Sequence, residues 1–124
     1  MTAISKEVKA TFDTTTTEGK IRIFNAQQSS GVSLKTLQTG QGIEVEAVLQ
    51  YQDVTEEYGA PQEVTITVLY GTDGVLYSSI SNSVADAGAN LIDLFAELGV
   101  DSLPITIQRN KSKSDRDFIT LSIG

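Results

Sequence analysis

The residues best suited to chemistry in this chain are its four tyrosines, because histidine, cysteine and tryptophan are all absent. Without histidine, no side chain titrates near neutral pH in its ordinary state. Without cysteine, disulfides and thiolate metal ligands are excluded. Histidine-based catalysis and zinc sites are therefore ruled out. Carboxylates, hydroxyls and lysines remain, but they form no recognisable catalytic spacing, so we expect neither an enzyme nor a cofactor.

Three of the tyrosines lie near predicted loops or strand ends. Tyr58 sits beside Gly59 in a polar segment, Tyr51 ends an apolar stretch before that segment, and Tyr77 follows a predicted turn. An exposed tyrosine ring can stack on an unpaired nucleobase, which contributes about 1–3 kcal/mol per base. The ordinary alternative is a half-buried ring whose hydroxyl reaches water. Both interpretations stay open for each of the three.

Positive charge is confined to the two ends of the chain. No Lys or Arg occurs between residues 36 and 108, a stretch with eleven acidic residues, and the formal net charge is −7. Such a net charge ordinarily argues against a nucleic-acid partner. The field near a site depends on where charges lie, however. A fold that brings the two ends together would create a basic face on an acidic protein.

Two basic segments are the candidate phosphate contacts. Lys20 and Arg22 share one side of a predicted strand with Phe24, and this mixture of cations and an aromatic ring suits a nucleic-acid backbone. Lys35 lies in the polar segment that follows. The loop before the last strand is similar to a flexible phosphate-contacting hairpin. Both segments could instead be solvated surface. The cations of the loop are Arg109, Lys111, Lys113 and Arg116.

Strand patterns dominate the chain, which we expect to form a single domain of residues 1–124. Apolar and polar residues alternate in short stretches bounded by turn-forming residues, as they do in half-buried strands. Residues 53–62 and 109–117 are expected to be loops, and residues 71–74 a hairpin turn. The expected strands are residues 8–12, 20–24, 32–34, 43–51, 63–70, 75–77, 104–108 and 118–123.

One helix is expected at about residues 83–98. Apolar residues repeat there at spacings of three and four, and Gly99 is placed to end the helix. The predicted order is several strands, then this helix, then two strands. This order is compatible with a mainly β, OB-type Greek-key barrel. A β-sandwich with an accessory helix is the competing architecture. No apolar run could span a bilayer and no signal peptide is evident, so we expect an intracellular protein.

Several segments carry a resemblance to a known family. They are Val8–Asp13, Glu18–Gln27, Gln50-Tyr51, Tyr58-Gly59, Gly74–Ser81 and Leu91–Leu94. With them, the chain resembles the single-stranded-DNA-binding proteins of small tailed phages whose linear genomes replicate by protein priming. The similarity covers nearly the whole chain, and its most specific part is residues 20–27.

The resemblance implies an OB-like protein that coats single-stranded DNA without sequence preference and protects the displaced strand during replication. Tyrosines contribute to binding in that family, and Tyr51, Tyr58 and Tyr77 are the matching positions here. The implied partners are single-stranded DNA and the phage replication machinery, in the cytoplasm of an infected bacterium, with a monomer as the expected state. The alternative is a structural or protein-interaction β-domain of a virion, with no nucleic-acid binding.

Overall fold

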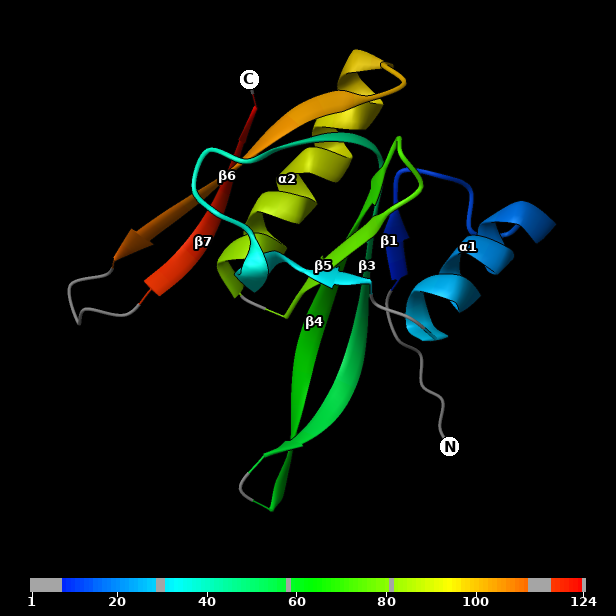
Figure 1. The fold of residues 1–124 in the computed structure, drawn as a ribbon. Helices are drawn as coiled ribbons and strands as arrows, with labels where there is room; N and C mark the ends of the chain where they lie inside the picture. Colours follow the sequence, from blue (N-terminus) through cyan, green and yellow to red (C-terminus); the bar gives the residue numbers. More distant parts are fainter. Residues whose placement is uncertain (1–7, 29–30, 58, 81, 112–116, 124) are drawn as a thin grey trace.

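A single curled sheet and two helices make up the part of the chain that the structure describes (Figure 1). The computed structural model describes residues 8–28, 31–57, 59–80, 82–111 and 117–123, without the side chains of residues 35, 54–57, 60, 62, 82, 111, 117 and 118. The fold is mainly β and OB-like, as the order of predicted strands indicated. Its elements are β1 (Val8–Ala10), α1 (Thr17–Gln28), β2 (Val32–Ser33), a 3-10 turn (Leu34–Thr36), β3 (Gly42–Glu57), β4 (Ala60–Gly71), β5 (Leu76–Ser79), α2 (Asn82–Leu98), β6 (Leu103–Lys111) and β7 (Asp117–Ile123).

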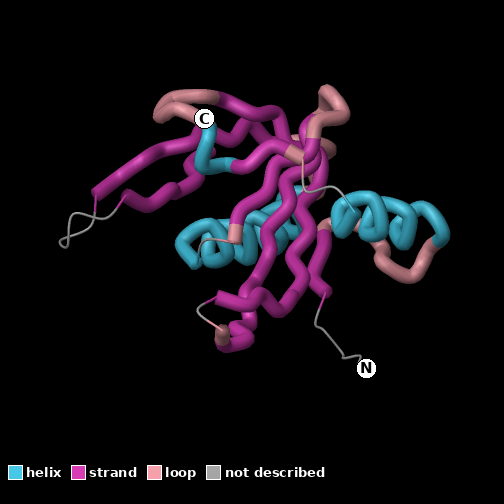
Figure 2. Tube along the Cα trace, turned by 60° about the horizontal axis from the view of Figure 1, so that its bottom comes forward, coloured by secondary structure: helices cyan, strands magenta, loops and turns pink. Residues whose placement is uncertain are grey.

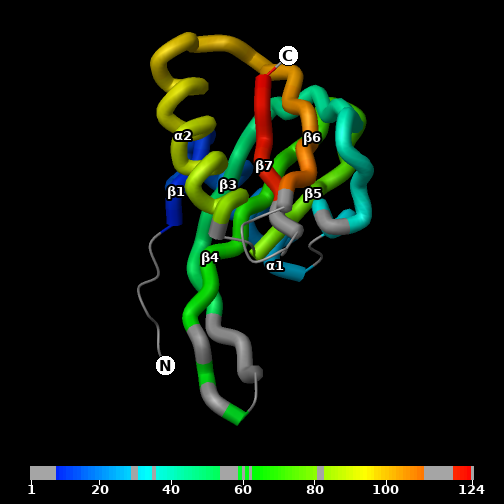
Figure 3. The backbone as a smooth tube through the Cα atoms, turned by 90° about the vertical axis from the view of Figure 1, so that its left-hand side faces the viewer, coloured from blue at the N-terminus to red at the C-terminus, as the bar shows by residue number. Residues whose placement is uncertain are grey.

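The long strand β3 organises the sheet, whose strand order is β2-β5-β4-β3-β6-β7. It pairs antiparallel with β4 from Val45 onward, with β6 through its first residues, and with β1 through Leu49–Tyr51. The short edge strand β2 runs parallel to β5. The β3–β4 hairpin extends away from the rest of the fold (Figures 1 and 3).

A β-bulge in β3 changes which residues face which side of the sheet. The register with β4 shifts between Val45 and Ala47, so Glu46 is an extra residue on the bulged strand. Side chains alternate along a regular strand, but Val45 and Val48 here belong to the same core. Ala47 belongs to the core on the opposite face.

Each face of the sheet has its own hydrophobic core, and each core takes in one helix. The α2 core joins this helix to both ends of the sheet and includes Leu69, Val84 and Phe95. The α1 core is smaller, with Ala26 and the half-buried Ile23 from the helix. Figure 1 shows the two helices well apart. The sheet therefore separates two packing environments.

The segment around residues 20–24 is part of helix α1, so the predicted strand there is wrong. Thr16 begins the helix: its hydroxyl accepts a hydrogen bond from the amide of Gly19 at 3.0 Å, as an N-cap does. The buried side of α1 is formed by Gly19, Ile23 and Ala26, whose spacings of four and three residues match the period of a helix. The alternation of Lys20 to Phe24 was compatible with either structure.

The segment of residues 53–62 was also wrongly predicted, as a loop. β3 and β4 continue through it, and the pairing runs out to Glu57 and Ala60. Other expectations are confirmed. α2 spans Asn82–Leu98, and the amide of Gly99, at a φ of 64°, donates to the carbonyl of Phe95 at 2.9 Å. The predicted turn at residues 71–74 is present, as are the edge strand at residue 32 and the two last strands.

Candidate functional site

The tyrosines predicted to stack on bases do not share one face. Tyr51 is 6% exposed and lies in the α1 core. Tyr77 is half-buried and packs against the α2 core on the other side of the sheet. Tyr58 lies outside the described residues. A ring buried as Tyr51 is offers no face to a base, so the expectation of an exposed ring at this position is not met.

The two basic segments also lie apart. Figures 1 and 2 place α1 and the strands β6 and β7 on opposite sides of the molecule, so within the described residues the expected joining of the two ends into one basic face is wrong. The reason is the strand pairing: β1 and β6 bind different parts of β3 rather than each other. Arg109 is exposed on β6. Lys113 and Arg116 are outside the described residues, as are the side chains of Lys35 and Lys111.

Arg22 packs against the sheet, and its side chain is 32% exposed. Its guanidinium carbon lies 5.3 Å from the ring centre of Phe12 and 5.5 Å from that of Tyr70, within the range of cation–π attraction. A guanidinium nitrogen is 3.8 Å from a carboxylate oxygen of Glu46. The hydroxyl of Tyr70 donates to the Arg22 carbonyl at 3.0 Å. These contacts hold α1 against the sheet, and they leave Arg22 less available to a phosphate.

Lys20 and Phe24 are the exposed pair on α1. They are four positions apart in the sequence, so they lie on the same side of the helix about one turn apart. The Phe24 ring is 60% exposed. The predicted combination of a cation and an aromatic ring is therefore present on a helix surface, without Arg22.

The environment of the tyrosines changes their acidity. Burial raises the pKa of Tyr70 to about 12, although the Arg22 guanidinium acts in the opposite direction. Burial also raises the pKa of Tyr51, and the Asp53 carboxylate adds to this effect. Tyr77 has a raised pKa for the same first reason, with a contribution from Asp73. All three side chains are therefore neutral hydroxyl groups at physiological pH.

We expect the free energy of unfolding to fall as the pH rises from about 10 toward 12. An unfolded tyrosine loses its proton near pH 10, whereas folded Tyr70 keeps it until about 12. In this interval the unfolded chain binds fewer protons, so stability decreases with pH. Urea unfolding at several pH values would measure the slope, and Tyr70→Phe should make it shallower. An equally steep slope in the variant would contradict this assignment.

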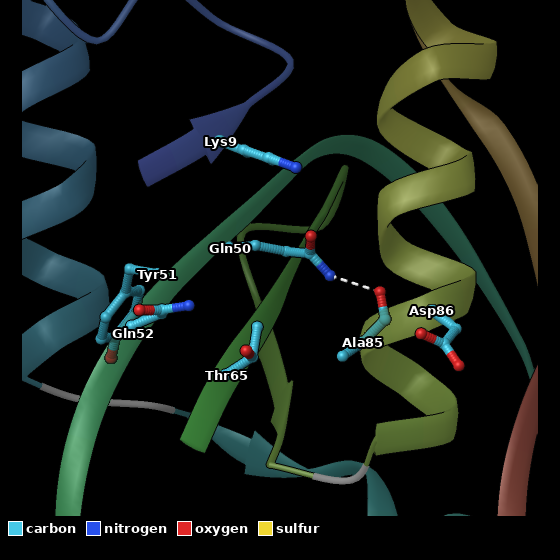
Figure 4. A pocket seen from close by; sticks show the side chains of 7 residues that line it. All are labelled: Lys9, Gln50, Tyr51, Gln52, Thr65, Ala85 and Asp86. Atoms are coloured by element: carbon cyan, nitrogen blue, oxygen red, sulfur yellow. Dashed lines mark hydrogen bonds between the residues drawn. The ribbon is translucent and has the colours of Figure 1, made fainter. Parts of the chain in front are cut away.

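A polar pocket of about 200 Å³ lies between β1, β3, β4 and the first half of α2 (Figure 4). Its lining includes a cation, two amides, a hydroxyl and a carboxylate. Figure 4 shows the Lys9 side chain directed from β1 into the space between the sheet and α2. The lining residues are Lys9, Gln50, Tyr51, Gln52, Thr65, Ala85 and Asp86.

Gln50 is the fixed element of this pocket. Its side-chain nitrogen donates to the carbonyl of Ala85 at 2.7 Å and to the hydroxyl of Thr67 at 3.1 Å. Gly88 permits this approach, because a Cβ at that position would stand 2.7 Å from the Gln50 nitrogen. The strand therefore connects directly to the helix through a buried amide.

The site residues predicted from the sequence do not include Lys9, Gln50, Gln52 or Thr65. A signal was present: Gln50 and Gln52 alternate on β3, and each pairs with a threonine of β4, Thr67 and Thr65. Polar residues thus occupy two successive positions on the side of β3 that faces α2, where the preceding residue on that side, Val48, is apolar. That pattern marks a polar patch at the border of a core.

Among residues 8–28, 31–57, 59–80, 82–111 and 117–123, no group of three or more acidic side chains is arranged to hold a metal ion. No helix in the described part of the chain has the length and apolarity needed to cross a membrane.

The fold is an OB-like β-domain with a small polar pocket on its sheet. The chain belongs to the phage single-stranded DNA-binding protein family, whose model, that of phage phi29, matches residues 2–124. The resemblance found in the sequence is therefore confirmed. The family is named for binding and not for a reaction, which agrees with the expectation that the chain is no enzyme.

Individual relatives give the same result. The single-stranded DNA-binding protein of Bacillus phage phi29 is 42% identical over 117 residues, which are 94% of this chain and 94% of the relative. That of Bacillus phage B103 is 39% identical over 118 residues, 95% of this chain and 97% of the relative. That of Bacillus phage PZA is 42% identical over 117 residues, 94% of both chains. No solved structure gives a significant match.

Proposed function

We propose that this protein binds single-stranded DNA without sequence preference during phage DNA replication. The observation that carries the proposal is the family match over residues 2–124, supported by relatives about 40% identical that are named for this activity. Coating would protect the displaced strand. We place this role in the cytoplasm of the infected bacterium, with the replication machinery as partner and a monomer as the binding unit.

Contacts with DNA are proposed at side chains of several elements. Lys20 and Phe24 on α1 offer a cation beside an aromatic ring, and Arg109 on β6 offers a further cation. Tyr77 and Tyr58 are the tyrosines proposed to stack on bases. Tyr51 is proposed to act from within, as part of the pocket wall, because its ring is buried. Lys35, Lys111, Lys113 and Arg116 complete the set of proposed phosphate contacts.

Titration with poly(dT), followed by tyrosine fluorescence at low and then at moderate salt, tests the proposal. The chain has no tryptophan, so the signal comes from tyrosine alone. We expect quenching on binding. If poly(dT) causes no quenching and shows no mobility shift with the protein, the proposal is wrong and a structural virion component is favoured.

The affinity for poly(dT) should depend moderately on salt. Each phosphate neutralised by Lys or Arg releases condensed counterions, which contributes about −0.7 to the slope of log K against log salt on a single strand. With about four such contacts the slope should be near −3. A titration series in sodium chloride measures it. A slope near zero would show that these cations do not contact phosphates.

Tyr77→Leu should weaken poly(dT) binding by about 1–3 kcal/mol if the ring stacks on a base. Leucine keeps apolar contact with the α2 core but has no π face. Tyr77→Phe keeps the ring and is the matched control, expected to bind as the parent does. Fluorescence polarisation of a labelled oligonucleotide measures both variants. Equal affinity of all three proteins would remove Tyr77 from the proposed contacts.

A further inference from the structure

We propose that the polar pocket between the β3–β4 surface and α2 receives one unpaired nucleobase and binds the edge that base pairing would occupy. The inference rests on the proposed function, since it assigns to DNA binding a site for the base edge itself. Its residues are distinct from the exposed side chains of α1 and β6. The central group is the side-chain oxygen of Gln50.

The orientation of the Gln50 amide is fixed by its partners. A backbone carbonyl can only accept hydrogen bonds, so the atom 2.7 Å from the Ala85 oxygen must be the nitrogen Nε2. The oxygen Oε1 then points the other way, toward the space beside Lys9 (Figure 4). Gln50 is only 6% exposed. No described residue donates a hydrogen bond to Oε1, so a buried acceptor is directed into the pocket.

A buried acceptor of this kind needs a donor, because leaving it unmet costs free energy. Every unpaired nucleobase has a free N–H group on its pairing edge. Thymine offers its ring N3–H, and cytosine and adenine offer amino groups. A single acceptor therefore binds any of the bases, which agrees with binding that has no sequence preference.

The size and the rim of the pocket fit the same ligand. Sites for drug-sized ligands have volumes of about 300–1,000 Å³, and this pocket has about 200 Å³, room for one small ring system. Lys9, on the rim, is exposed and can meet the phosphate next to the bound base. Gln52 and Thr65 have polar groups that can adapt to different base edges.

Recognition of the pairing edge would also separate single strands from duplex. A base in a duplex has its edge occupied by its partner and cannot enter the pocket without unpairing, which costs free energy. The pocket therefore favours single-stranded over double-stranded DNA more directly than stacking surfaces and phosphate contacts do.

The experiment compares a thymidine homopolymer with the same polymer methylated at N3 of thymine. Methylation removes the N–H donor but leaves the phosphates and the stacking ring. We expect the native protein to bind the methylated polymer about tenfold more weakly, the loss of about one hydrogen bond. Equal affinity for the two polymers would overturn the pocket and leave the proposed DNA binding standing. Failure to bind either polymer would overturn the proposed function itself.

Ala85→Leu fills the pocket from α2 and leaves the backbone carbonyl that holds Gln50. We expect this variant to bind the unmethylated polymer about tenfold more weakly and to lose the difference between polymers. Ala96→Leu, an exposed position on the same helix, should keep the native behaviour. If the Ala85→Leu variant still binds the unmethylated polymer more tightly than the methylated one, as the native protein does, the thymine N3–H group is bound at another site.

Lys9→Gln provides a variant at an exposed position whose folding we expect to be native. Because Lys9 is assigned to phosphate, the change should weaken binding to both polymers by the same factor and reduce the salt slope by about one. The methylation effect should persist in this variant. An unchanged salt slope would remove Lys9 from the rim contact.

Discussion

Replacing Leu69 with alanine is expected to lower the free energy of unfolding by about 2–5 kcal/mol, the usual cost of truncating a leucine in a closed core. Leu69 is fully buried in β4, paired in register with Val48 on one side and Tyr77 on the other. Neighbours on both strands and α2 surround it, so collapse around the cavity is restricted. A domain of this size has a total stability of about 5–15 kcal/mol, so a large fraction would be lost.

Urea unfolding would measure the change as a lower midpoint with an unchanged slope. Leu98→Ala is the matched control, because Leu98 ends α2 and is 53% exposed. Surface changes of this kind stay within about 0.5 kcal/mol. Similar midpoints for the two variants would contradict the assignment of Leu69 to the α2 core.

Gly19→Ala is expected to destabilise the protein by about 3 kcal/mol, at the upper end of the range for overpacking. A Cβ at this position would overlap the backbone carbonyl of Asp13 and stand 3.1 Å from the Thr16 hydroxyl. The carbonyl belongs to the main chain and cannot rotate away. The segment leading into α1 must therefore shift, although alanine is intrinsically the better helix former by about 1 kcal/mol.

The second effect of this change would be on α1 itself. The Thr16 cap and the hydrogen bonds of Thr15 to the Asp13 carboxylate, which lower the pKa of that carboxyl, form one local structure. Circular dichroism should show reduced helix content together with the lower urea midpoint. Asn25→Ala, exposed on α1, is the control and should leave both unchanged. Native helix content and stability in the Gly19 variant would show that the loop accommodates the methyl group.

The sequence could predict those elements whose pattern had a single interpretation. The apolar period of residues 83–98 and the Gly99 terminator led directly to α2, and the Asp73-Gly74 turn to the β4–β5 connection. Helix α1 could not be predicted in this way. Its central residues alternate as a strand would, and the deciding interactions are tertiary: Ala26 packing on the sheet and Tyr70 bonding the Arg22 carbonyl.

The candidate site was predictable in its residue types but not in its arrangement. Tyrosines and cations are residue types suited to nucleic acid, and their role in binding stays a prediction. The burial of Tyr51 and the stacking of Arg22 on Phe12 depend on how the sheet faces its helices. The resemblance to relatives located the family without locating the contacts. Gln50 could not be predicted as a site residue because a glutamine in a strand is ordinarily a surface residue, and only its hydrogen bond to Ala85 shows that it forms a pocket wall.

The extra residue in β3 sets the phase of the strand on either side of it. Before the bulge, odd-numbered residues such as Val45 face α2, and after it even-numbered residues such as Val48 and Gln50 do. A slip of one residue in a strand reverses every side chain beyond it. The extra residue Glu46 therefore decides which face each later side chain of β3 occupies. With it, Gln50 faces α2 and Tyr51 faces the opposite core, and a strand without it would place each of these two side chains on the other face.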